Sequence, residues 1–314
     1  MLHLRLIVPP DRTDEVVRTV ERTVGTAHLA VLTGAARNPS GDLVLCDVAR
    51  EAGDALIGHL RELGLDKDGS IAVDSIDLSL STRADEAEEE APGEGADAVL
   101  WEQLTDATHE ESTLSFTYMA FLTLATMIAA CGVVLDNAIL IVGAMAVGPE
   151  FGPLAGFSTA MVQRLPRLAW RSLAALIVGF AAAMAVTVLF SYFMDGAGLF
   201  ERAMLRADRP NTGFIYDPDA FSFVVAVLAG IAGTLSLTSA KSGALVGVAI
   251  SVTTVPAAAN AAVALSYGEY GQAWGSAEQL LLNLLGIILA GTLTLFAQKW
   301  LWSRRRRRAG KSAA

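Results

Sequence analysis

Long stretches without a charged residue are the feature of this sequence that most restricts its fold. A helix needs about 20 apolar residues to cross about 30 Å of hydrocarbon. Five uncharged stretches are that long: 112–135, 172–194, 220–240, 242–268 and 279–298. A sixth stretch, between Asp136 and Arg164, has 27 residues and is interrupted only by Glu150. The sequence therefore predicts an α-helical polytopic membrane domain of six transmembrane segments over residues 113–303.

The charged residues gather outside those stretches. Of the 314 residues, 53% are hydrophobic and 18% are charged, and residues 1–110 carry a net charge of −14 while the remainder carries +4. An acidic soluble part followed by a membrane part accounts for these values and excludes fibrous, wholly disordered and disulfide-rich classes. The two cysteines, Cys46 and Cys131, fall in different parts and imply no disulfide or zinc framework.

The first 81 residues alternate between strand and helix patterns. Strands are predicted at 2–8, 27–33, 43–48 and 71–80, and helices at 11–23 and 51–63. The order β-α-β-β-α-β predicts an α+β ferredoxin-like domain over residues 1–81. Because this fold hosts many functions, the sequence leaves open an interaction module and an effector-binding domain.

Residues 82–112 are predicted to connect the two parts. The stretch 83–97 contains seven acidic residues and almost no large apolar side chain, which is typical of a flexible linker. Trp101, with Val99, Leu100 and Leu104, then predicts a short amphipathic helix that could lie at the membrane surface.

Basic residues in the connecting segments predict the orientation. Positive charge lies at Arg164–Arg171, at Lys241 and in the tail 304–314, so these parts are expected in the cytoplasm. Six segments then place the N-terminal domain in the cytoplasm as well, and the expected location is the bacterial plasma (inner) membrane. The run Arg304–Arg308 also fits nucleic-acid binding, but an anchor on anionic lipid is the preferred interpretation, and no nucleic-acid partner is predicted.

The second segment carries helix-breaking residues around a carboxylate. Pro149 and Pro153 each lack the backbone donor that a helix needs, so both are expected to interrupt it. Gly148, Gly152 and Gly156 are four apart and allow close approach of another backbone. Glu150 has 13 uncharged residues on each side, so it is expected near the middle of the span, where a carboxylate must be protonated, paired or hydrated.

The fifth segment repeats this pattern more weakly. It contains Pro256 and, in the positions around it, the polar residues Thr253, Thr254 and Asn260. Segments one to three and four to six are therefore predicted to form a 3+3 inverted repeat with broken helices 2 and 5, which is typical of transporters. Asn283, in segment six, is interpreted as an interhelical hydrogen-bonding residue or, alternatively, as a ligand.

These motifs carry a family resemblance. The stretches DNAILIVGAMAVGPEFGP (136–153), LAGIAGTLSLT (228–238) and GVAISVTTVPAAAN (247–260), followed by Asn283, resemble domain-of-unknown-function family three hundred and eighty-nine, uncharacterised hydrophobic bacterial membrane proteins. The resemblance covers roughly residues 112–298, and the N-terminal part resembles a cytoplasmic domain that some members carry. It implies a membrane architecture and no particular substrate. Many members have Ser-Pro-Leu-Met-Gly-Pro where this chain has Gly148–Pro153.

The predicted function is that of a secondary transporter or channel-like permease for a small solute or ion. The alternative is a membrane-anchored sensor or scaffold without transport activity. For Glu150 itself, proton exchange is predicted, and the alternative is a hydrogen bond to Asn or Thr side chains of segment five that locks the two halves together. No catalytic, metal or cofactor motif is present, so no enzyme is predicted. A homo-oligomer is expected from Gly- and Ala-rich faces. The candidate binding residues are Gly148, Pro149, Glu150, Gly152, Pro153, Thr253, Thr254, Pro256, Asn260 and Asn283.

Overall fold

The chain divides into two compact units in a computed structural model that describes residues 1–76, 78–91, 93, 98–239 and 254–312. The smaller unit is built on Met1–Gln103, and the larger on Leu104–Leu237 with the helices that continue to Trp300. Thr253 and the other residues of the predicted fifth segment before Thr254 lie outside the described residues.

An antiparallel sheet of four strands forms the smaller unit. The strands are β1 (Leu2–Val8), β2 (Thr26–Arg37), β3 (Ser40–Val48) and β4 (Ser70–Ser75), in the order β2-β3-β1-β4. The helices α1 (Thr13–Arg22), α2 (Arg50–Glu62) and the short α3 (Leu65–Asp68) complete the order β-α-β-β-α-β that the sequence predicts, with α3 as an addition.

The core of this unit follows from alternation along the strands. Leu2, Leu4, Leu6 and Val8 of β1 are buried while the residues between them are not, as expected for a sheet with one covered face. They form one apolar cluster with side chains of α1 and α2. Cys46 lies in the same cluster, and burial, followed by the charge of Asp47, raises the pKa of its thiol to about 11.

The acidic segment after the sheet is partly helical. Residues predicted to form a flexible linker instead begin with α4 (Thr82–Glu90), which is capped by Ser81 and packs against β2 and β3. The reason is that Ala84 and Ala87 share one face of the helix and are buried, while the acidic residues lie on the other faces. The predicted amphipathic helix is α5 (Trp101–Glu111), and Leu100 before it packs into the core of the smaller unit.

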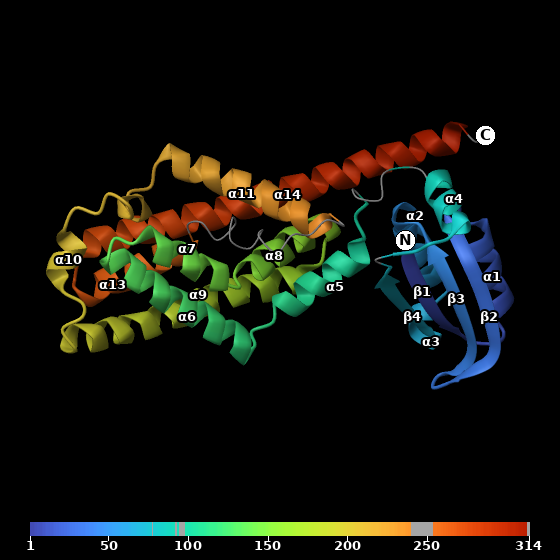
Figure 1. Cartoon of the computed structure of the whole chain (residues 1–314), viewed down its shortest axis with the longest axis horizontal. Helices are drawn as coiled ribbons and strands as arrows, with labels where there is room; N and C mark the ends of the chain where they lie inside the picture. The colour runs from blue at the N-terminus through green and yellow to red at the C-terminus, as the bar shows by residue number, and fades with distance from the viewer. Residues whose placement is uncertain (77, 92, 94–97, 240–253, 313–314) are drawn as a thin grey trace. The chain divides into compact units, whose positions relative to one another are not determined.

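The larger unit is helical. Its elements are α6 (Phe116–Val134), α7 (Ala138–Val147), α8 (Phe151–Gln163), α9 (Pro166–Gly196), α10 (Arg202–Arg206), η2 (Gly213–Ile215), α11 (Ala220–Thr238), α13 (Thr254–Ser266) and α14 (Tyr270–Ser312) (Figure 1). Among the described residues, α6, α9, α11 and α14 are each long and apolar enough to cross a membrane, and α7 with α8 makes one bent pair. These helices are compatible with a multi-pass membrane protein.

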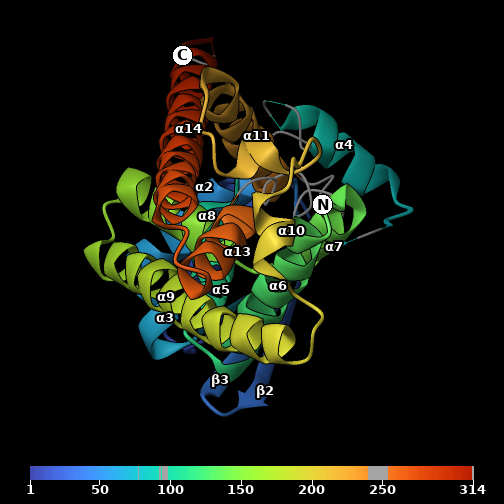
Figure 2. The ribbon, with the colours of Figure 1, turned by 90° about the vertical axis from the view of Figure 1, so that its left-hand side faces the viewer.

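Helix α13 is enclosed by the other helices of this unit. Eleven consecutive residues from Thr254 to Ala264 are buried, and six of them are alanine. The helix packs against α6 and α9, and Figure 2 shows it at the centre of the helices. Small side chains let neighbouring backbones approach closely where no hydrophobic effect drives helices together.

Side-chain contacts show that the connecting segments of this unit form two groups, one at each end of the helices. In the first group, Asp136 accepts hydrogen bonds from Asn211 and Thr212, and Glu269 pairs with Arg202 and Arg206. The turn after α6, the segment before α11 and the turn between α13 and α14 therefore lie at one end of the unit.

The second group lies at the other end of the helices. Lys299 donates a hydrogen bond to Gln163 at 2.9 Å, and Arg171 bonds to Thr113 and His109. The residues before α6, the turn between α8 and α9 and the end of the apolar part of α14 are thereby brought together. Chain direction therefore alternates between the two ends from α6 through α9.

Candidate functional site

A break in the helical backbone lies at Gly148–Glu150. Helix α7 ends at Gly148, whose N–H still bonds to the Ala144 carbonyl, and α8 begins after Glu150 at an angle of 54°. Pro149 causes the break because it has no N–H and its ring clashes with the preceding turn. Pro153 does not break the helix as predicted. It is the third residue of α8, where the backbone N–H has no intrahelical acceptor.

Glu150 contacts the beginning of α13. Its side chain is 1% exposed, and its Oε1 accepts a hydrogen bond of 2.8 Å from the hydroxyl of Thr254, which is fully buried. Glu150 precedes α8 and Thr254 is the first residue of α13, so the N-terminal ends of both helices meet at this carboxylate. Helix N-termini favour negative charge. Pro256 is the third residue of α13, as Pro153 is of α8.

Gly148, Gly152 and Gly156 allow side chains and neighbouring helices to approach closely. A Cβ at Gly148 would lie 3.1 Å from Val255 and would collide with the Glu150 carboxylate. A Cβ at Gly152 would lie 2.6 Å from the Cβ of Glu111, on α5. At Gly156 it would collide with Ser112 and Ser172. Gly148 therefore gives Glu150 its position, and the other two glycines seat α8 against neighbouring segments.

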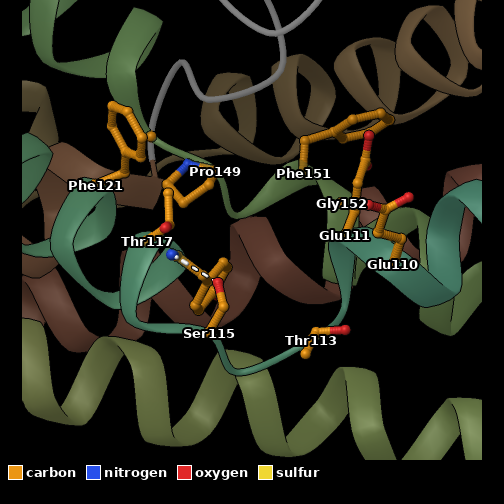
Figure 3. Close-up of a pocket in the computed structure, with 11 residues that line it drawn as sticks. Glu110, Glu111, Thr113, Ser115, Thr117, Phe121, Pro149, Phe151 and Gly152 are labelled. Carbon is orange, nitrogen blue, oxygen red and sulfur yellow. Dashed lines mark hydrogen bonds between the residues drawn. The ribbon is translucent and has the colours of Figure 1, made fainter.

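A pocket of about 390 Å³ opens beside the break. Figure 3 shows Pro149 and Phe151 on one side of it and the end of α5 with the beginning of α6 on the other. Burial, followed by the charge of Glu110, raises the pKa of Glu111 here. The lining residues are Glu110, Glu111, Thr113, Ser115, Thr117, Tyr118, Phe121, Gly148, Pro149, Phe151 and Gly152.

The pocket lining shows where the break lies along α6. The α6 residues that line it, from Thr117 to Phe121, belong to the first two turns of that helix. The break is therefore beside one end of α6 and not beside its centre. Consistent with this position, Gly152 and Gly156 of α8 lie against Glu111 and Ser112, which precede α6.

Asn260 lies in a second polar cluster, farther along α13. Arg209 is 3% exposed, donates hydrogen bonds of 2.9 Å to Asn260 and to Gln272, and lies 4.7 Å from the centre of the Tyr216 ring. Burial lowers the pKa of this guanidinium. The amide of Asn260 donates in turn to Ser276 at 2.6 Å. Asn260 thus joins the segment before α11 to α14.

Sequence reasoning missed most of this second cluster. Arg209, Gln272, Ser276 and Gln279 were not singled out in the sequence. Their spacing with Asn283, by four, three and four residues, is the signal that could have shown a polar face on α14. Asn283 is fully buried on that face. No group of three or more metal-ligating side chains occurs among the residues that the structure describes.

Comparison with known proteins gives a family for much of the larger unit. Residues 145–289 match the profile of a family described as "Domain of unknown function (DUF389)". This stretch of the chain is therefore similar to the DUF389 family. The matched stretch contains Glu150, Thr254, Asn260 and Asn283, and it excludes the smaller unit and α6. The predicted resemblance is confirmed.

One relative of this chain has a name that states no function. An uncharacterised protein of Methanocaldococcus jannaschii is 25% identical to the chain over 210 residues, which are 67% of this chain and 63% of that protein. The chain thus spans less than two thirds of that relative's length. No solved structure matches the chain.

Proposed function

We propose that the protein is a multi-pass permease for a small solute or ion, with its path at the break between α7 and α8 and at the beginning of α13. The observation that carries this proposal is the buried contact between Glu150 and Thr254, which joins the N-terminal ends of two short helices. Interrupted backbone within a membrane is tolerated where protein or a water-filled cavity receives its polar groups. Short helices that meet in this way form central sites in transporters.

The pocket indicates the conformational state of the proposed permease. It reaches Gly148 and Pro149 from the side of α5, while Glu150 beyond them is buried and bonded to Thr254. We interpret the pocket as the entrance and the Glu150–Thr254 hydrogen bond as a closed gate. Opening would separate α8 from α13.

The proposal includes six spans in two inverted halves. In the first half, a long helix (α6) is followed by a broken pair (α7 and α8) and another long helix (α9). In the second half, α11 and α14 flank α13, whose Thr254 meets the first half at its break. Because the turn after α13 pairs with the segment before α11, α13 ends where α11 begins, as the proposed fifth segment would.

Blocking the pocket should test permeation. Thr117→Trp places an indole at an exposed lining position and should reduce permeation to the rate of protein-free vesicles. Phe116→Trp is the matched control, because Phe116 is 89% exposed and does not line the pocket. Proteoliposomes would be exposed to hyperosmotic urea, glycerol or potassium chloride, and entry of each probe would be followed by stopped-flow light scattering.

The same assay decides between the two functional classes. If vesicles with the unsubstituted chain take up all three probes no faster than protein-free vesicles, a membrane-anchored sensor or scaffold is favoured. Equal inhibition by Thr117→Trp and Phe116→Trp would show that the pocket is not the path.

We also propose a bacterial inner-membrane location with both termini in the cytoplasm. The basic residues at Arg164–Arg171 and in the tail support this orientation. Asn211→Cys, in a chain with Cys46→Ala and Cys131→Ala, should react in intact cells with a thiol reagent that does not cross membranes. A cysteine introduced at Glu89 should be protected, and the reverse result would invert the orientation.

Self-association remains a prediction. The faces that suggested it pack within one chain, since Gly179 lies against Tyr118 and Leu122, and Gly230 lies against Ile287 and Ala290.

A further inference from the structure

Helix α14 carries a polar stripe on its buried face. Gln272, Ser276, Gln279 and Asn283 follow one another by four, three and four residues, so they project from one side of the helix. Ser276, Gln279 and Asn283 are fully buried. Leu281 and Leu285, on the opposite side, are 57% and 54% exposed. The helix thus turns its polar side inward and its leucines outward.

The two ends of the stripe differ in hydrogen bonding. At the end near Arg209, Gln272 and Ser276 accept from Arg209 and Asn260. Farther along, both polar atoms of Gln279 and both of Asn283 have no hydrogen-bond partner among the residues that the structure describes. A buried amide without a partner costs about 1–3 kcal/mol in proteins, so two such amides one turn apart favour partners beyond the residues that the structure describes, such as water or a solute.

The unpartnered amides lie toward the Glu150 site. Helices α13 and α14 are joined by three residues and run antiparallel, with Asn260 opposite Ser276. From that level Thr254 is six residues away along α13 and Asn283 is seven residues away along α14. At 1.5 Å per residue these distances are about 9 Å and about 10 Å. Asn283 is therefore level with Thr254, which binds Glu150.

We propose that the α14 stripe lines a hydrated passage for small uncharged polar solutes, leading from Arg209 to the Glu150–Thr254 contact. This inference rests on the proposed permease function and assigns its solute class. Gln279 and Asn283 offer donors and acceptors without charge, which suits hydroxyl, amide or water partners. The two charges along the stripe are at its ends, where Arg209 and Glu150 are already bonded to Asn260, Gln272 and Thr254. A charged solute between them would meet no opposite charge on the stripe.

Alkylation of introduced cysteines tests the passage. Gln279→Cys and Asn283→Cys would be made in the full chain with Cys46→Ala and Cys131→Ala, reconstituted in vesicles. The controls are Ala129→Cys, buried in the apolar core of α6, and Leu281→Cys, on the outward face of α14. Iodoacetamide, which is small and uncharged, should modify both stripe positions at least about tenfold faster than either control, because a hydrated site admits water-borne reagents.

The charge of the reagent tests the solute class. Iodoacetate is nearly the same size but negatively charged, and intact-mass measurement gives both rates. The ratio of the iodoacetamide rate to the iodoacetate rate should be higher at positions 279 and 283 than at Asn211→Cys, which is exposed. An equal ratio would overturn the selectivity for uncharged solutes, and stripe rates equal to that of Ala129→Cys would overturn the passage.

Hydroxyl-radical labelling of the unsubstituted chain gives the same test without cysteine variants that could misfold. Pro256, near the passage, should be oxidised, while Leu122 in the apolar core should not, although both are buried. Equal protection of the two would contradict a hydrated passage. Neither experiment depends on transport. Labelling of the passage without permeation would refute only the permease function. Permeation without labelling would refute only this passage.

Discussion

Replacing Glu150 by glutamine should remove the pH dependence of solute flux and leave the chain folded. Glutamine keeps the shape of the side chain and an oxygen that can accept from Thr254, but it cannot ionise. Intramembrane carboxylates that exchange protons drive many transporters, so the pH-dependent component of flux should fall by about tenfold or more. Flux into proteoliposomes would be compared between pH 6 and pH 8, with the solute that the light-scattering assay selects.

Two further variants separate proton coupling from a structural lock. Glu278→Gln makes the same chemical change at an exposed position of α14 and should leave the pH response unchanged. Thr254→Val removes the donor and should lower the free energy of unfolding by about 2 kcal/mol, since hydrogen bonds to charged groups contribute about 1.5–3 kcal/mol. If Glu150→Gln keeps the pH response, proton coupling is refuted. If it only lowers thermal stability, the lock is the better account.

Replacing Arg209 by methionine should destabilise the larger unit by about 2 kcal/mol or more, because two buried amide oxygens lose their donor and each unsatisfied buried acceptor costs about 1–3 kcal/mol. The acceptors that would lose their donor are the amide oxygens of Asn260 and Gln272. Arg209→Lys should recover only part of the loss, since an ammonium lacks the planar fork that reaches both oxygens while lying over Tyr216. Denaturant titration in detergent would measure each difference.

Arg202 provides the matched control for this prediction. It pairs with Glu269 in the same connecting segment, but its side chain is 51% exposed. Exposed ion pairs contribute about 0–1 kcal/mol, so Arg202→Met should change stability by less than about 1 kcal/mol. Equal losses for Arg209→Met and Arg202→Met would show that the hydrogen bonds to Asn260 and Gln272 do not stabilise the unit.

Local patterns were sufficient to predict the elements of the smaller unit and the long apolar helices. The alternation of Leu2, Leu4 and Leu6 predicts β1, and the absence of charged residues predicts α6 and α9 as long apolar helices. Helix α4 was missed because its acidic composition outweighed the two alanines that face the sheet. A composition argument averages over a segment, whereas packing depends on one face of it.

The candidate site was predicted only in part. Pro149 and Glu150 could be singled out because such residues are unusual in an apolar stretch. The contact between Glu150 and Thr254 appeared only as one alternative, since it joins residues 104 positions apart. Arg209 could not be placed, because loop charges were used for orientation, and nothing local shows that a loop arginine turns inward onto Asn260.

The enclosure of α13 has a consequence for how the protein is made. The buried side chains of α13 contact α6 and α9, which come earlier in the chain. These side chains, from Thr254 to Ala264, end against protein, so they are not selected for contact with lipid. Helices α6 and α9 must therefore already be in the bilayer before α13 acquires its surroundings. We infer that α13 packs late in biogenesis, into a space that the earlier helices have prepared.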